Sequence, residues 1–344
     1  MKQYRVLIVD DSPTMRRLIR SILEQDPRLQ VVAEAGTARE ARDAVNTFKP
    51  NVMTLDVEMP NMSGVEFLRR LMRHRPMPVV MVSTLTKKGS SIAVEALSLG
   101  AVECIEKPRL GQEHDTFAYL ADTIAMAAQA RVTSRPVRSV APKVVTKERH
   151  FKRICLIGGS TGAVDAIEQV LKNFPANCPP TLITQHMPEA FLVSFASRLD
   201  QVVEPKVSLA KHGEILKAGQ VFIAPGGAYH LNVSSTGDLS TQLLEGPKVS
   251  GHRPSVDSMM LSAKNIAHQV AAGILTGMGS DGAEGMAELR KLGARTLGQS
   301  KETCVVFGMP RVAGEMGGVE KWADLDQFAD EILKMAEIPT REVV

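Results

Sequence analysis

The chain has 344 residues, of which 44% are hydrophobic and 23% charged, and its formal net charge is +3. A single core seldom serves more than about 250–300 residues, so this length predicts two domains of a soluble globular protein. The small charge gives no reason to expect nucleic acid as a partner, and no apolar run approaches the ~18 residues of a membrane span. The four cysteines form no zinc or disulfide pattern, and by elimination we expect a cytoplasmic protein.

The first 128 residues alternate apolar runs with amphipathic segments. This alternation favours an α/β domain, in which a doubly wound parallel sheet is covered by helices on both faces. The expected strands are Arg5–Val9, Val31–Ala35, Val52–Leu55, Val79–Val82 and Val102–Ile105, and the expected helices are Thr14–Glu24, Ala38–Phe48, Ser63–Arg73, Ser90–Leu99 and Phe117–Ala130.

Polar residues gather where these strands end, at the edge where doubly wound sheets bind ligands. They are Asp10 and Asp11 after the first strand, Asp56 after the third, Ser83 after the fourth and Lys107 after the fifth. Three carboxylates at one edge repel each other unless a cation neutralises them, and Mg²⁺ prefers such oxygen ligands. Asp56 is then a candidate nucleophile for an aspartyl phosphate, and Lys107 a point charge for phosphate oxygens.

Three segments, VLIVDDSPTMRR, LDVEMPNMSGVEFL and KP, resemble the receiver domain of two-component response regulators. The resemblance implies a flavodoxin-like (βα)5 fold and phosphorylation of Asp56 by a histidine kinase. It further implies that Mg²⁺ is held by Asp11, Asp56 and the carbonyl of Glu58, with Asp10 behind them.

The same resemblance gives roles to two more side chains. Ser83 is implied to be the hydroxyl that moves toward the phosphoryl group, with Lys107 beside it. Many receivers place an aromatic switch residue near the fifth strand, where this chain has Cys104. This departure bears on signalling through an aromatic switch and leaves phosphorylation itself unaffected.

Residues 129–150 have no helical periodicity and carry six Arg or Lys against one Glu, together with Pro136 and Pro142. Such a composition predicts an exposed linker, with a docking role for its charge as the alternative. We therefore expect a receiver domain at 1–128, a basic linker at 129–150 and a second domain at 151–344.

The second domain is also expected to be doubly wound, with a mostly parallel, Rossmann-like sheet. Turn dipeptides and alternating strands suggest that an irregular stretch after His186 includes an antiparallel hairpin at one edge of the sheet. The expected strands are Arg153–Ile157, Thr181–Gln185, Val270–Leu275 and Arg295–Gln299, the hairpin is Tyr229–Ser234 with Leu239–Leu244, and the expected helices are Val164–Phe174, Ser255–Ala267 and one running toward Leu292.

The glycine-rich turn GGSTGA, which follows the first of these strands, could cradle a phosphate or present a nucleophile. The dinucleotide pattern G-x-G-x-x-G requires glycine where this chain has Ile157, and an acid where it has His186. No G-x-x-x-x-G-K-[ST] loop occurs in the sequence. Cofactor binding is therefore disfavoured.

A nucleophile turn fits better, because Gly158, Ser160 and Gly162 match the G-x-S-x-G elbow between strand and helix. The helix that follows offers backbone N–H groups and a positive dipole end for an oxyanion. His186 and Asp281 follow other strands at the same edge, which suggests a Ser-His-Asp triad in an unusual chain order. Each of the three has a structural alternative when taken alone, and their convergence favours the triad.

Six ordered segments, GGSTGA, LITQHMP, FIAPGG, HRPSVD, ILTGMGSDGAEGM and CVVFGMPR, resemble the catalytic domain of the chemotaxis protein-glutamate methylesterases, the CheB family. The resemblance implies hydrolysis of glutamate γ-methyl esters, and deamidation of glutamines, on methyl-accepting chemotaxis receptors. The protein would be peripheral to those membrane receptors, and the hydrolysis would need no cofactor.

Carried onto this chain, the resemblance makes Ser160 the nucleophile, His186 the general base and Asp281 its partner. The backbone N–H groups of Met278 and Thr161 would bind the oxyanion, and the Thr161 hydroxyl would steady His186. The segment HRPSVD is expected to shape the cleft without a catalytic step of its own.

The departures from the family pattern are small: Gly159 stands where the family often has Ala, and Ala163 where it often has Gly. We expect the unphosphorylated receiver to cover the strand ends of the esterase domain and to restrict access to it. The rival interpretations are a response regulator with a DNA-binding output domain, which would need a basic recognition helix, and a general serine esterase or protease.

Overall fold

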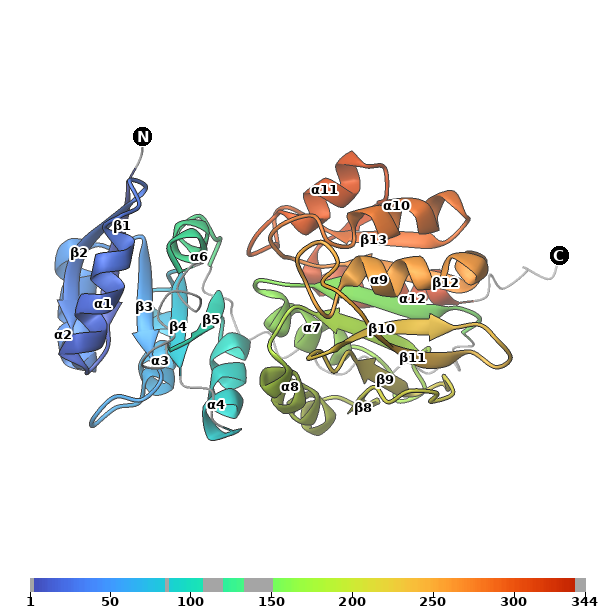
Figure 1. Cartoon of the computed structure of the whole chain (residues 1–344), viewed down its shortest axis with the longest axis horizontal. Coiled ribbons are helices and arrows are strands. Elements are labelled where there is room, and N and C mark those ends of the chain that lie inside the picture. Colours follow the sequence, from blue (N-terminus) through green and yellow to red (C-terminus); the bar gives the residue numbers. More distant parts are fainter. Residues whose placement is uncertain (1–2, 84–86, 108–119, 133–150, 338–344) are drawn as a thin grey trace. The chain divides into compact units, whose positions relative to one another are not determined.

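The computed structural model describes residues 3–83, 87–107, 120–132 and 151–337. The chain divides into two compact units, residues 1–138 and 139–344. The first unit holds a five-stranded sheet, and the second holds a seven-stranded sheet and a separate pair of strands (Figure 1). The predicted pair of α/β domains is thereby confirmed. Most of the predicted linker, and the start of the helix predicted at Phe117–Ala130, lie outside the described residues.

The first unit has the strand order β2-β1-β3-β4-β5, with every neighbouring pair parallel. This is the flavodoxin-like order, as expected. Its elements are β1 (Tyr4–Val9), α1 (Pro13–Leu23), β2 (Leu29–Ala35), α2 (Ala38–Phe48), β3 (Val52–Asp56), α3 (Gly64–His74), β4 (Val79–Ser83), α4 (Lys87–Ser98), β5 (Glu103–Glu106) and α6 (Leu120–Ala127).

Short polar side chains decide where the first three helices begin. Ser12, Thr37 and Ser63 are N-caps, and each side-chain oxygen accepts a hydrogen bond from the backbone N–H three residues on, at 3.2 to 3.3 Å. Such caps satisfy a donor that the first helical turn leaves open, which is why the predicted starts lie within a residue of the observed ones. None of the helices in the described ranges has the length and apolar character that a membrane crossing requires.

The second unit has the strand order β14-β13-β12-β6-β7-β9-β8, and every neighbouring pair is parallel. Its elements are β6 (Ile154–Gly159), α7 (Ala163–Leu171), β7 (Thr181–Gln185), α8 (Glu189–Val202), β8 (Lys206–Leu209), β9 (Gln220–Ile223), β10 (Tyr229–Ser234), β11 (Ser240–Glu245), α9 (Val256–Ser262), the 3₁₀ helix η1 (Lys264–Gln269), β12 (Val270–Ile274), α10 (Ala283–Lys291), β13 (Arg295–Gln299), α11 (Met309–Glu315), β14 (Lys321–Ala323) and α12 (Leu325–Ala336).

The stretch after His186 is more regular than the sequence suggested. It contains α8 and the two parallel strands β8 and β9, each of four residues, which extend the sheet beyond β7. Strands this short carry little periodic signal, and their pairing with a neighbour creates them. The predicted antiparallel hairpin is present as β10–β11, and its strands form a two-stranded sheet of their own.

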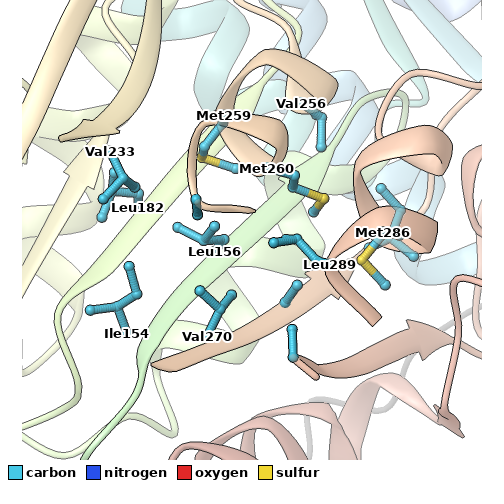
Figure 2. Close-up of a cluster of buried hydrophobic side chains, with 14 of the residues drawn as sticks. Ile154, Leu156, Leu182, Val233, Val256, Met259, Met260, Val270, Met286 and Leu289 are labelled. Atoms are coloured by element: carbon cyan, nitrogen blue, oxygen red, sulfur yellow. The ribbon is translucent and has the colours of Figure 1, made fainter. Parts of the chain in front are cut away.

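Helices cover both faces of the seven-stranded sheet. Figure 2 shows Ile154 and Leu156 of β6 beneath Met259 and Met260 of α9, with α10 beside them. On the opposite face, a Cβ atom placed on Gly273 of β12 would lie 3.0 Å from side-chain atoms of α12. Burial on both faces explains why these strands read as continuous apolar runs rather than alternating ones.

Candidate active site

Three neighbouring strands bring the predicted catalytic residues to one edge of the sheet. Strand β6 lies between β7 and β12, and its last residues pair with Gln185 on one side and Ile274 on the other. Ser160 follows β6 and His186 follows β7, so they leave adjacent strands at the same level, as the hydrogen bond from His186 N to Gly159 O at 3.2 Å indicates. The loop after β12 carries Asp281 to this edge, as predicted.

The nucleophile turn is held by hydrogen bonds from both neighbouring strands. The N–H of Ser160 donates to the carbonyl of Thr276 at 3.1 Å. The carbonyl of Ser160 accepts from Gln185 Nε2 at 2.9 Å and from the N–H of Ala163, also at 2.9 Å. Gly162 is the N-cap of α7 with a φ of +78°, a left-handed conformation that favours glycine. The local backbone of Ser160 is therefore fixed on all sides.

Two glycines allow close approaches around this turn. A Cβ atom on Gly277 would lie 2.3 Å from Sδ of Met309 and 2.8 Å from the Cβ of Ser160, so the loop after β12 can pass between them only without a side chain there. A Cβ atom on Gly159 would lie 2.5 Å from that of Ala163. Gly159 and Ala163, the two departures from the family pattern, therefore contact each other, and only one of them can carry a methyl group.

His186 is oriented by Asp281. The ring Nε2 lies 2.7 Å from Asp281 Oδ2, and the two side chains are only 6% and 1% exposed. Nδ1 is buried and has no hydrogen-bond partner within the described residues. A ring that donates from Nε2 to a carboxylate keeps its lone pair on Nδ1, and this leaves Nδ1 as the atom available to a serine proton. No hydrogen bond between Ser160 Oγ and the ring is present in the described part of the chain.

Asp281 is a fully satisfied buried carboxylate. Its Oδ1 accepts from the hydroxyl of Ser255 at 2.7 Å and from the N–H of Asp257 at 3.0 Å, and its Oδ2 accepts from the N–H of Val256 at 2.7 Å. Burial alone would raise its pKa, but the hydrogen bonds and the charge of His186, with the bonds from Asp257 and Ser255, hold the pKa below its usual value. The carboxylate is therefore kept ionised.

The hairpin supports this carboxylate indirectly. Ser255, which is also the N-cap of α9, donates its backbone N–H to Nδ1 of His230 on β10 at 3.1 Å. The other nitrogen of His230 lies 2.9 Å from the carbonyl of Pro247. Sequence reasoning missed this support, although Ser255 stands in the segment HRPSVD as an N-cap before a helix, which was the available signal.

Gln185 and Thr276 were also missed. Gln185 is the last residue of β7, and its amide links the Ser160 carbonyl to the base-bearing strand. The Thr276 hydroxyl donates to the carbonyl of Thr161 at 3.0 Å. Both are polar, fully buried residues at strand ends, and that position was the signal that would have found them.

A second histidine packs against the predicted base. The rings of His186 and His252 are stacked, with centroids 3.7 Å apart and planes inclined by 8°. Burial and the neighbouring His186 lower the pKa of His252 to about 4. His252 is therefore neutral near pH 7 and presents an uncharged face to the base.

The two residues expected at an oxyanion site lie beside the turn. Thr161 is buried directly after Ser160. Met278 follows Gly277 and is 47% exposed. The backbone N–H of Met278 makes no hydrogen bond to any other residue that the structure describes.

The first unit holds the predicted acidic pocket at the carboxyl ends of its strands. Oxygens of Asp10, Asp11 and Asp56 lie within 4.8 Å of one another. Lys107 Nζ lies 3.0 Å from Asp10 and 2.8 Å from Asp56. Its N–H donates to the carbonyl of Ser83 at 2.7 Å, which ties the end of β4 to this pocket.

The charge of this pocket suits a divalent cation. Burial raises the pKa of Asp56 to about 6, against the opposing effect of Lys107 and with a further contribution from Asp10. Burial would lower the pKa of Lys107, but the two carboxylates raise it. The ammonium group of Lys107 pairs with two of the three clustered carboxylates, and such a set of oxygen ligands fits Mg²⁺. The N–H of Glu58 donates to Asp56 at 3.3 Å, which places the third implied ligand residue next to the pocket.

Two family models match the chain. The model described as "Response regulator receiver domain" matches residues 6–115, and the model described as "CheB methylesterase" matches residues 155–332. The chain belongs to the CheB methylesterase family.

Members of this family match the chain over almost its whole length. A protein-glutamate methylesterase/protein-glutamine glutaminase from Rhizobium etli is 50% identical over 334 residues, 96% of each chain. One from Caulobacter vibrioides is 48% identical, over 98% of this chain and 99% of its own. The crystal structure of the Thermotoga maritima CheB methylesterase catalytic domain matches with a TM-score of 0.51 and 35% identity, over 53% of this chain and 98% of that one. The family resemblance predicted from the sequence is confirmed.

Proposed function

We propose that the chain hydrolyses glutamate γ-methyl esters, and deamidates glutamines, on methyl-accepting chemotaxis receptors, with Ser160, His186 and Asp281 as the catalytic triad. The observation that carries the proposal is the buried 2.7 Å contact between His186 and Asp281, at the strand end beside Ser160. Relatives that are 50% and 48% identical to this chain are named for this dual activity. Four free cysteines agree with the reducing cytoplasm in which we place it.

The proposed chemistry follows from these positions. Nδ1 of His186 removes the Ser160 proton while Oγ attacks the ester carbonyl, and the imidazolium formed is stabilised by the ionised Asp281. The N–H groups of Met278 and Thr161 would bind the developing oxyanion. His186 returns the proton to the leaving methanol, and water then releases the glutamate by the same steps. A glutamine follows the same path with ammonia as the leaving group.

The direct test is Ser160→Ala, with methanol release from methylated receptor as the measurement. We expect turnover to fall by roughly 10³- to 10⁶-fold, because the nucleophile is lost. Ser235→Ala, which changes an exposed serine in the turn between β10 and β11, is the matched control and should retain full activity. Near-normal methanol release by Ser160→Ala would refute the assignment, and activity on small esters without activity on receptor would favour a general esterase.

The receiver unit is proposed to be phosphorylated on Asp56 by a histidine kinase. Mg²⁺ would be held by Asp11, Asp56 and the Glu58 carbonyl with Asp10 behind them, and would neutralise charge on the phosphoryl oxygens. Lys107 lies 2.8 Å from Asp56 and would contact the same oxygens, and the Ser83 hydroxyl would move toward them.

The test of the receiver is incorporation of phosphate from a small-molecule phosphodonor. Asp56→Asn should abolish incorporation, and EDTA should abolish it in the unchanged protein. Asp43→Asn, at an exposed position on α2, is the control. Incorporation that survives in Asp56→Asn would place the acceptor elsewhere.

We further propose the domain arrangement 1–128, 129–150 and 151–344, in which the unphosphorylated receiver restrains the esterase. Phosphorylation would replace the carboxylate charge of Asp56 with a phosphoryl group that carries about −1.5 to −2, and would shift that restraint. A fragment beginning near residue 150 should release methanol faster than the unphosphorylated full chain. Equal rates would exclude this form of control, and salt-dependent binding to duplex DNA would favour the rival with a DNA-binding output domain.

A further inference from the structure

The ring of His252 lies flat against the ring of His186, at 3.7 Å between centroids and 8° between planes. It is the face of the base that His252 covers, whereas Asp281 meets the edge at Nε2. A single contact at one edge atom defines a direction within the ring plane but leaves the tilt of the plane open. A flat surface against the face removes that remaining freedom.

The backbone around His252 is anchored on both sides. Val249 and His252 exchange two hydrogen bonds, at 3.0 and 2.9 Å, across a two-residue turn whose Ser250 and Gly251 have φ values of +51° and +82°. Such a turn between paired residues is a tight hairpin connection. On the other side, Arg253 donates at 2.6 Å to the carbonyl of Gly227 and at 2.6 Å to that of Gly246. The ring is therefore presented to His186 by a fixed segment.

The ring of His252 makes no hydrogen bond to any residue in the described ranges, so its polar atoms do not explain its position. The charged and titratable groups that act on it are His186, Asp281 and Lys248, and with burial they leave it neutral above about pH 4. A neutral aromatic face tolerates, and attracts, the positive charge that His186 acquires when it takes the serine proton. A charged side chain in this place would oppose that step.

We propose that His252 is a positioning residue for the esterase reaction: its ring fixes the plane of His186 so that Nδ1 faces Ser160. The proposal rests on the proposed function, because it concerns the same base. It assigns His252 no proton transfer and no contact with the substrate. The reaction requires the planar face of the His252 ring but not its nitrogens.

Three substitutions in the full chain separate these features. His252→Ala removes the face, His252→Leu fills the space without a planar ring, and His252→Phe restores a planar ring without nitrogens. We expect kcat for methanol release from methylated receptor to fall about 10- to 100-fold in the Ala and Leu variants, the loss typical of a misplaced catalytic group. KM should change by less than about threefold, and His252→Phe should recover most of kcat.

Labelling of Ser160 by a fluorophosphonate provides a second readout that does not depend on receptor binding, and it should slow in the same order. His268→Ala, at an exposed position in η1 just before β12, is the matched control at the other end of the sheet. Denaturation followed by fluorescence confirms that each variant is folded before its rate is compared.

The outcomes are distinguishable. An unchanged kcat in His252→Ala, or a Leu variant as fast as the Phe variant, would show that no planar face is needed and would overturn the proposal. A Phe variant as slow as the Ala variant would show that a ring nitrogen acts directly, which also overturns it. Ser160→Ala assayed in parallel tests the proposed function: full activity in that variant refutes the triad itself, whatever the His252 variants do.

Discussion

Replacing Gly159 by alanine would place a methyl group 2.5 Å from the Cβ of Ala163. Carbon atoms that are not joined through a common bonded atom do not approach each other so closely. The next nearest atoms, on Gln185 and Leu275, would lie at an ordinary 3.5 Å. The conflict is therefore with Ala163 alone. Gly159 is the last residue of β6 and is itself buried, and the sheet and α7 leave little room to move there.

The magnitude follows from this geometry. Overpacking a closed core by one methyl group costs about 1–3 kcal/mol, so Gly159→Ala should lower the free energy of unfolding by that amount. Ala163→Gly removes a buried methyl group and adds backbone freedom, which together cost about 1–2 kcal/mol. The double variant only moves the methyl group across the contact, and should lie within about 1 kcal/mol of the unchanged protein, with a favourable coupling of about 1–3 kcal/mol.

The assay is a denaturant titration followed by the fluorescence of Trp322. This is the single tryptophan of the chain, and it lies on β14, so it reports on the second unit alone. Methanol release is a second readout, because the displaced backbone precedes Ser160 directly. If the double variant is as unstable as the sum of the two single changes, with a coupling below about 0.5 kcal/mol, the two positions do not form the proposed pair and the reasoning fails.

Three further predictions concern the surroundings of the triad. Ser255→Ala removes a hydroxyl that both caps α9 and donates to Asp281 at 2.7 Å, so the free energy of unfolding should fall by about 1–3 kcal/mol in the same titration. A loss below about 0.5 kcal/mol would contradict the shared role. Gly277→Ala places a methyl group 2.3 Å from Sδ of Met309, a flexible side chain, and 2.8 Å from the Cβ of Ser160. It should reduce kcat by about 10²-fold because the nucleophile shifts, and an unchanged kcat would show that the loop moves without displacing Ser160. The pKa of His252 is lowered to about 4, so the unfolded chain binds this proton first and stability should decline as the pH falls from about 6.5 toward 4. Titrations at several pH values should give a shallower decline for His252→Phe, and equal slopes would refute the assignment.

Local sequence patterns predicted much of the fold. Helix α2 and the strands β7, β10 and β13 have the predicted bounds, because a capping residue, an apolar run or a turn dipeptide marks each end within the segment itself. Strands β8 and β9 escaped prediction because their four residues become strands only through pairing beside β7. The polar residues at strand ends were also predictable from local sequence. Where an apolar run stops, the polar residue that follows it marks the end of the strand.

The amino-acid sequence alone was enough to identify the chemical groups at the strand ends: a serine between glycines, a histidine, four carboxylates and a lysine. Their order along the chain could be read from apolar runs and turns, since these are local properties. How these groups act on one another depends on the three-dimensional packing of the chain. Asp281 accepts hydrogen bonds from four groups, one of which is the ring nitrogen of His186, and the ring of His252 stacks on that of His186. All of these contacts join residues from 24 to 95 positions apart. No local pattern specifies such contacts, because they follow from the packing of the whole sheet and its helices.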